Sequence, residues 1–89
     1  MAYSIEIAPA AERQLKAIRS KTLQQRIVDH ILELKTNPRP PGIEKMQGSE
    51  EDLYRLRVGD YRIIHHIQDQ ASTILVVKIG HRKDIYRRL

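Results

Sequence analysis

Three arginines that recur with the spacing of a β-hairpin are the residues of this sequence best suited to chemistry. Arg55 and Arg57 are two residues apart, and Arg62 lies just beyond a Gly-Asp pair typical of a tight turn. Residues two apart on a strand point to the same side of a sheet. A hairpin over residues 53–67 therefore presents all three guanidinium groups on one face. Such a face predicts an anionic partner, because the planar guanidinium pairs well with phosphate or carboxylate.

The charge of the whole chain agrees with this expectation. Residues 1–52 carry eight Lys or Arg against eight Asp or Glu, whereas residues 53–89 carry eight against three. The net charge of +5 therefore lies entirely in the second part of the chain. Clustered basic charge predicts a nucleic acid or an acidic protein as partner, with a merely solvated basic face as the alternative.

Length and composition limit the architecture and the chemistry. The 89 residues are expected to form a single domain over residues 1–89, with an aliphatic core, since there is no Phe and no Trp. The absence of Cys excludes disulfides, thiolate zinc sites and a Cys nucleophile, and is compatible with the cytoplasm. No apolar run approaches the roughly 20 residues that span a bilayer, and the N-terminus does not read as a signal peptide. We therefore expect a cytoplasmic protein without a membrane partner.

Hydrophobic periodicity predicts the elements that position the arginines. A first strand is followed by two amphipathic helices, a proline-rich loop, the hairpin and a last apolar strand, over residues 3–7, 9–19, 23–35, 37–42, 53–67 and 73–79. Residues 81–89 are expected to form a turn and a short helix. This order predicts an α+β fold, β-α-α-β-β-β, in which an antiparallel helix pair packs on one face of a small, antiparallel-dominated sheet. The first strand is expected at a sheet edge.

Two sequence motifs carry a resemblance to a known family. The run LYRLRVGDYRIIHHI at residues 53–67 and the closing GHRKDIY at residues 80–86, with this element order, resemble the RelE group of the RelE/ParE superfamily of type II toxin–antitoxin systems. The resemblance spans essentially the whole chain. It implies a ribosome-dependent mRNA interferase, an endoribonuclease toxin that inhibits translation by cutting messenger RNA in the ribosomal A site without a metal or cofactor. It also implies a RelB-like antitoxin, contact with ribosomal RNA, and operator DNA binding only as the toxin–antitoxin complex.

The resemblance also assigns roles to residues. Metal-free RNA cleavage uses attack of a 2′-OH on the adjacent phosphate, which requires a base, an acid and positive groups around the phosphate. By position, the phosphate-handling arginines are Arg62 and Arg82, and Tyr86 corresponds to an aromatic residue that stacks on a base of the message. The predicted catalytic set is Arg57, Arg62, His81, Arg82 and Tyr86, and the predicted RNA-binding set is Arg55, Lys78 and Lys83.

One departure from the family pattern concerns the general base. Arg57 stands where the best-known members have a lysine proposed as the base, and an arginine does not lose its proton near neutral pH. A histidine titrates in the working range, so His81, next to Arg82, is the preferred candidate, and His66 is the second. The remaining interpretation is that the site acts by charge alone, slowly or not at all.

Two other functions are compatible with the same fold. One is a ParE-like, non-catalytic inhibitor of DNA gyrase, and the other is an inactive toxin-fold protein that only binds antitoxin and operator. The fold cannot distinguish them, because function depends on the site. A metal site at His65 and His66 is not expected, because adjacent strand residues point to opposite faces. We expect His65 to be a core residue whose polar atoms are satisfied.

Overall fold

A computed structural model describes residues 2–46 and 53–85 of the chain. In chain order the elements are β1 Ser4–Ile7, α1 Pro9–Lys16, α2 Lys21–Glu33, β2 Ile43–Lys45, β3 Leu53–Val58, β4 Tyr61–Gln68 and β5 Thr73–His81. The predicted α+β class and the order of the predicted elements are confirmed, with β2 as an additional short strand. The predicted C-terminal helix lies largely outside the described residues. None of the helices in the described ranges is long and apolar enough to cross a membrane.

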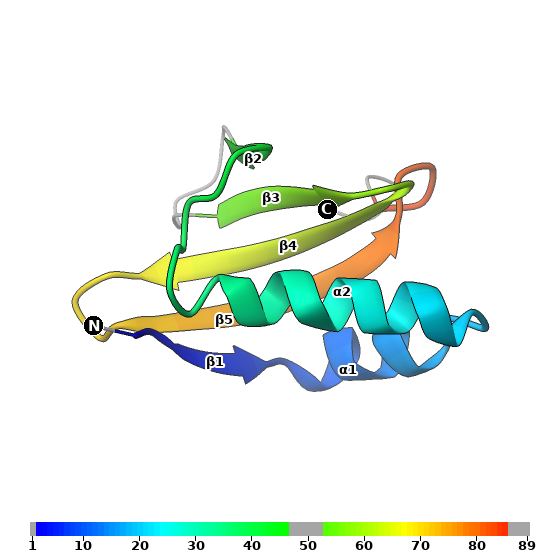
Figure 1. Ribbon diagram of the computed structural model, residues 1–89, viewed down its shortest axis with the longest axis horizontal. Helices are drawn as coiled ribbons and strands as arrows, with labels where there is room; N and C mark the ends of the chain where they lie inside the picture. Colours follow the sequence, from blue (N-terminus) through cyan, green and yellow to red (C-terminus); the bar gives the residue numbers. More distant parts are fainter. Residues whose placement is uncertain (1, 47–52, 86–89) are drawn as a thin grey trace.

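The five strands form one mixed sheet in the order β1-β5-β4-β3-β2 (Figure 1). The pairs β2–β3, β3–β4 and β4–β5 are antiparallel, whereas β1 is parallel to β5. The two helices connect β1 at one edge of the sheet to β2 at the other edge, and β5, the last strand, lies between β1 and β4. As predicted, β1 lies at an edge, and β2 occupies the other edge next to β3.

Capping explains where the helices begin. Pro9 opens α1, where its missing N–H would have had no intrahelical acceptor. Helix α2 begins at Lys21, two residues before the predicted start, because the Oγ of Ser20 accepts a hydrogen bond from the backbone N–H of Leu23 at 3.1 Å. Helix α2 ends at Glu33, before the Asn37-Pro38 pair that disfavours further helix.

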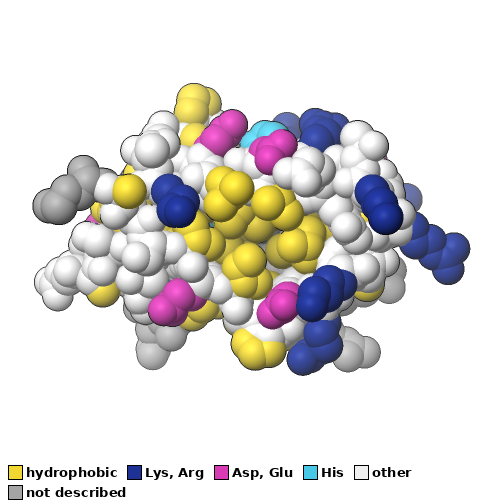
Figure 2. Space-filling model, turned by 60° about the horizontal axis from the view of Figure 1, so that its bottom comes forward, with side chains coloured by type: hydrophobic (Ala, Val, Ile, Leu, Met, Phe, Trp, Pro, Cys, Tyr) yellow, Lys and Arg dark blue, Asp and Glu magenta, His cyan; other side chains and the backbone are white. Residues whose placement is uncertain are grey.

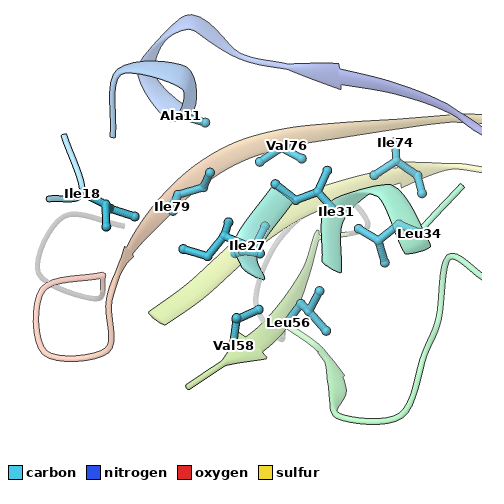
Figure 3. Packing of buried hydrophobic residues seen from close by; sticks show 11 residues of the cluster. Ala11, Ile18, Ile27, Ile31, Leu34, Leu56, Val58, Ile74, Val76 and Ile79 are labelled. Atoms are coloured by element: carbon cyan, nitrogen blue, oxygen red, sulfur yellow. The ribbon is translucent and has the colours of Figure 1, made fainter. Parts of the chain in front are cut away.

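The core lies between the helices and one face of the sheet, called here the helix face (Figure 3). Ile27 and Ile31 of α2, and Leu34 at its C-terminal cap, are almost completely buried against the sheet. The strand residues of this aliphatic cluster are Leu56, Val58, Ile63, Ile74, Val76 and Ile79. The opposite side of the sheet, called here the open face, carries the arginines.

A β-bulge separates the two ends of the β4–β5 ladder. Ile64 pairs with Lys78, but the next residue, His65, pairs with Val76, so Val77 has no direct partner. The bulge reverses the alternation along β5. Lys78 therefore lies on the open face although Val76, two residues earlier, lies in the core.

Candidate functional site

The strand register gathers the three arginines on the open face. Arg57 pairs directly with Arg62, and Arg55 pairs with Ile64, so all three side chains point to the same side of the sheet. The alternation in the sequence predicted this shared face, and the pairing confirms it. Like charges directly opposite each other repel, so the Arg57–Arg62 pair is a feature that favours an anion between the two guanidinium groups.

A small pocket lies over this part of the sheet. Its volume is about 110 Å³, and it is lined by Gly42, Glu44, Arg55, Arg57 and Arg62. We call it the arginine pocket. Glu44 comes from β2, where it pairs directly with Arg55 of β3, and the two side chains form an ion pair. The pocket therefore combines three cationic groups with one carboxylate.

The β3–β4 turn fixes the position of Arg62. Its Nη1 donates to the carbonyl oxygens of Gly59 and Tyr61, each at 2.9 Å. Gly59 has φ of +58°, a conformation that other residues adopt only with strain. A tight turn built on this glycine thus presents two carbonyl groups that orient the guanidinium of Arg62 toward the open face.

Arg82 is attached to the same turn. Its backbone N–H donates to the carbonyl oxygen of Asp60 at 2.7 Å, and its Nε lies 3.7 Å from Oδ1 of Asp60. The side chain of Arg82 remains 56% exposed. The structure therefore brings Arg82 next to the turn that holds Arg62, although Arg82 is not among the residues that line the arginine pocket.

His81 lies on the other side of the sheet from the pocket. It pairs directly with Tyr61, and the two rings form an edge contact with 5.6 Å between centroids. Tyr61 packs against the core cluster, so His81 is on the helix face. The Nδ1 of His81 accepts a hydrogen bond from the backbone N–H of Lys83 at 3.1 Å. The structure does not bring His81 together with Arg57 and Arg62.

The remaining predicted site residues lie in different parts of the structure. Lys78 is half-buried on the open face, where its Nζ donates to the carbonyl oxygen of Ile85 at 3.1 Å. His66 is on the open face too, but it lies four residues from Arg62 along β4, roughly 13 Å at the usual rise of a strand. Tyr86 lies outside the described residues. Within the described ranges, no three His, Cys, Asp or Glu side chains gather in a way that could hold a metal ion.

His65 is buried as predicted, but it is not satisfied. Its side chain is completely buried, and neither ring nitrogen has a hydrogen-bond partner among the described residues. Burial lowers the pKa of His65 to about 4, with a smaller contribution from the positive charge of Arg39. The ring stacks on Tyr54 with 6.1 Å between centroids. The prediction of satisfied polar atoms was wrong, because the core around the ring is apolar and aromatic.

An ion pair outside the pocket connects distant parts of the chain. Arg39, in the proline-rich loop, donates to both carboxylate oxygens of Asp69 in the β4–β5 turn, at 3.3 and 2.9 Å. The hydroxyl group of Tyr3 donates to the same carboxylate at 2.8 Å. The guanidinium of Arg39 also lies 5.2 Å from the ring centroid of Tyr54. This Arg39–Asp69 brace was not predicted, since the two residues are 30 positions apart.

A second surface feature is apolar. Figure 2 shows hydrophobic side chains gathered in the middle of one face of the molecule, with charged side chains around them. Two large hydrophobic side chains of the described residues are exposed, Ile7 of β1 at 37% and Leu32 of α2 at 49%. Exposed apolar surface of this kind commonly marks a protein-binding site.

Comparison with known proteins gives consistent matches. Residues 5–86 match the family model described as the ParE toxin of the type II toxin–antitoxin system parDE. The sequence is 26% identical to toxin RelG of Mycobacterium tuberculosis, covering 99% of this chain and 100% of the relative. It is 30% identical to the putative toxin RelE1 of Methanocaldococcus jannaschii, covering 98% of each chain.

The fold is similar to a solved toxin structure. The archaeal RelE–RelB complex from Pyrococcus horikoshii contains a chain that superposes with a TM-score of 0.82 at 27% identity, covering 94% of this chain and 99% of that one. The family description thus carries the ParE name, whereas the relatives and the solved structure carry RelE-type names.

Proposed function

Because the chain belongs to the ParE toxin family of type II toxin–antitoxin systems, and its relatives include RelE-type toxins, we propose that it is a ribosome-dependent mRNA endonuclease. The observation that supports this function is the arginine pocket, which places Arg55, Arg57 and Arg62 around a space on the open face. Cationic groups fixed around a phosphate stabilise the charge that develops when a 2′-OH attacks it, and no metal is needed for that step. The proposed site of action is messenger RNA in the ribosomal A site, in the cytoplasm.

The proposed roles follow from position. Arg57 and Arg62 stabilise the attacked phosphate, and Arg82, fixed at the same turn, contacts it or its neighbour. Arg55, Lys78 and Lys83 contribute to holding the RNA, with Lys78 partly engaged by the chain after β5. Tyr86 is proposed to stack on a base. His81 lies on the helix face, away from Arg57 and Arg62, so it is not assigned a proton transfer at the attacked phosphate.

We also propose a RelB-like antitoxin as partner. The P. horikoshii relative is in a complex with RelB, and the exposed side chains of Ile7 and Leu32 are proposed to contact an amphipathic helix of the partner. Contacts with ribosomal RNA, and operator DNA binding as the toxin–antitoxin complex, belong to the same proposal. If the purified chain binds no product of a neighbouring gene on co-expression, the antitoxin part of the proposal is wrong.

A ParE-like action remains the second candidate because the matching family model bears that name. Such a protein would inhibit DNA gyrase without cleaving RNA. The concentration of arginines in one pocket favours RNA cleavage instead. Inhibition of gyrase in a supercoiling assay, together with intact messenger RNA, would establish the alternative. A toxin-fold protein that is inactive would do neither.

The first experiment is induced expression in a bacterial host without antitoxin. Primer extension is carried out on a translated message and on the same message with a disabled start codon. We expect cuts within codons only on the translated copy. Growth arrest with intact message would direct attention to gyrase, and the absence of growth arrest would indicate an inactive member of the family.

A further inference from the structure

The arginines of the pocket can stabilise negative charge on the phosphate, but the cleavage reaction also needs a group that accepts the proton of the 2′-OH. The three arginines cannot do so, because the guanidinium stays protonated at any pH in question. His81 lies on the helix face, and His66 is too far along β4. Of the side chains that line the pocket, Glu44 is the one whose ionised form offers lone pairs and no proton.

The place of Glu44 is set by the short strand β2. Glu44 pairs directly with Arg55, which places its carboxylate on the same face as Arg57 and Arg62. Its side chain is 58% exposed, whereas that of its ion-pair partner Arg55 is 27% exposed. The carboxylate therefore lines the pocket and is also open to an incoming RNA. A base must reach the proton it removes, so this accessibility is the first requirement.

We propose that Glu44 is the general base of the RNA cleavage reaction, an assignment that rests on the proposed function. In the step, a carboxylate oxygen of Glu44 takes the proton of the 2′-OH while the 2′-oxygen forms a bond to phosphorus. The bond from phosphorus to the 5′-oxygen breaks, and that oxygen takes a proton from water. The products are a 2′,3′-cyclic phosphate and a 5′-hydroxyl end. Glu44 then returns its proton to the solvent, so the enzyme is unchanged.

The ion pair with Arg55 couples the base to the charge stabilisation. While Glu44 is ionised, it compensates the positive charge of Arg55. When the carboxylate takes up the proton, that compensation is lost at the moment when the phosphate gains negative charge. The positive field in the pocket thus becomes strongest in the transition state, which is the condition for lowering a barrier.

The competing role for Glu44 is that of a counter-ion that only holds Arg55 in place. The two roles predict opposite effects of Glu44→Gln on the cleavage rate. Glutamine keeps a carbonyl oxygen that can accept from Arg55, but it cannot take a proton. It also removes a negative charge from a cationic pocket, so RNA binding should become equal or tighter. A base predicts slower cleavage despite this, and a counter-ion predicts cleavage that is equal or faster.

The test is single-turnover cleavage on bacterial ribosomes that carry labelled messages with different codons in an otherwise empty A site. For Glu44→Gln we expect a rate at least about 100-fold lower, with unchanged or tighter ribosome binding. Glu44→Asp, which keeps the carboxylate but withdraws it by one methylene, should cleave at an intermediate rate. Glu12→Gln, in an ion pair with Lys16 on α1, is the matched control and should behave as wild type.

The outcomes separate the two proposals. If the wild type cuts and Glu44→Gln cuts within about threefold of its rate, Glu44 is a counter-ion and the assignment is wrong while the proposed function stands. If the wild type leaves every message intact, the proposed function fails and the assignment fails with it. A double variant controls for positioning: Glu44→Gln should slow cleavage further in an Arg55→Ala background. If it has no effect there, Glu44 acts only through Arg55.

Discussion

Arg62 is held beside the β3–β4 turn by two carbonyl oxygens and faces Arg57 across the hairpin. We expect Arg62→Ala to lower single-turnover cleavage by about 100- to 1,000-fold, because it removes one preorganised donor from the phosphate. The fold should persist, since the side chain is on the open face and outside the core cluster. Circular dichroism and ribosome-dependent cleavage would check both expectations.

A matched control for this variant is Arg26→Ala, because Arg26 is exposed on α2, away from the pocket. It removes the same charge from the molecule, so it measures the effect of net charge on ribosome binding. Wild-type cleavage by Arg62→Ala, or equal loss in both variants, would remove Arg62 from the proposed site.

His65 predicts a specific dependence of stability on pH. The folded state lowers its pKa to about 4, whereas the unfolded chain has the ordinary value near 6.5. The unfolded state therefore binds more protons between these values, and the free energy of unfolding falls as the pH decreases from 6.5 toward 4. The loss amounts to about 3 kcal/mol, and it is absent above pH 6.5.

Urea unfolding at pH 7.0 and 5.0 measures this dependence. In His65→Leu the decrease between the two pH values should be much smaller, since no imidazole remains to be protonated in the unfolded state. The control His30→Gln, on α2, should show the same decrease in the free energy of unfolding as the wild type. An undiminished decrease in His65→Leu would show that other groups cause the acid sensitivity.

At the scale of elements, the Arg39–Asp69 brace ties the loop after α2 to the β4–β5 turn and to the residue before β1. Hydrogen bonds from Arg39 hold the pKa of Asp69 below its usual range. The hydrogen bond that Tyr3 donates to this carboxylate stabilises the neutral phenol, so the pKa of Tyr3 is raised. Arg39→Ala should therefore raise the pKa of Asp69, and Asp69→Asn should lower that of Tyr3. Carboxyl-carbon NMR and ultraviolet titration would detect the shifts, and unchanged values would show that the brace does not form in solution.

The elements also show what the sequence could and could not predict. Alternation over residues 53–67 was sufficient to place Arg55, Arg57 and Arg62 on one face, because the hairpin pairing is local. The place of Glu44 in the pocket was missed, since β2 has only three residues and its pairing with Arg55 spans a segment without a clear pattern. The position of His81 was missed because β5 continues two residues beyond the predicted end, which pairs His81 with Tyr61.

For the molecule as a whole, one aliphatic cluster has to supply most of the stability. At 0.05 to 0.15 kcal/mol per residue, a chain of 89 residues is stable by about 4 to 13 kcal/mol. Ile27 is completely buried between α2 and the sheet. Ile27→Ala should cost about 2 to 5 kcal/mol, through lost burial and the cavity that remains. A single substitution could therefore remove most of the stability of this toxin.

The proposed antitoxin should reverse this loss, because a partner that binds only the folded state stabilises it. At a free concentration 100 times its Kd, the partner contributes about 2.7 kcal/mol. We expect Ile27→Ala to be poorly folded when expressed alone and folded when co-expressed with the antitoxin, as measured by soluble yield and thermal unfolding of the complex. Leu32→Ala, exposed on the same helix, should fold without the partner. If Ile27→Ala is recovered equally with and without the antitoxin, either the core is more tolerant than its burial implies or the partner does not act on the folded state. Thermal unfolding of the free variant distinguishes the two, since only a tolerant core would leave its transition near that of the wild type.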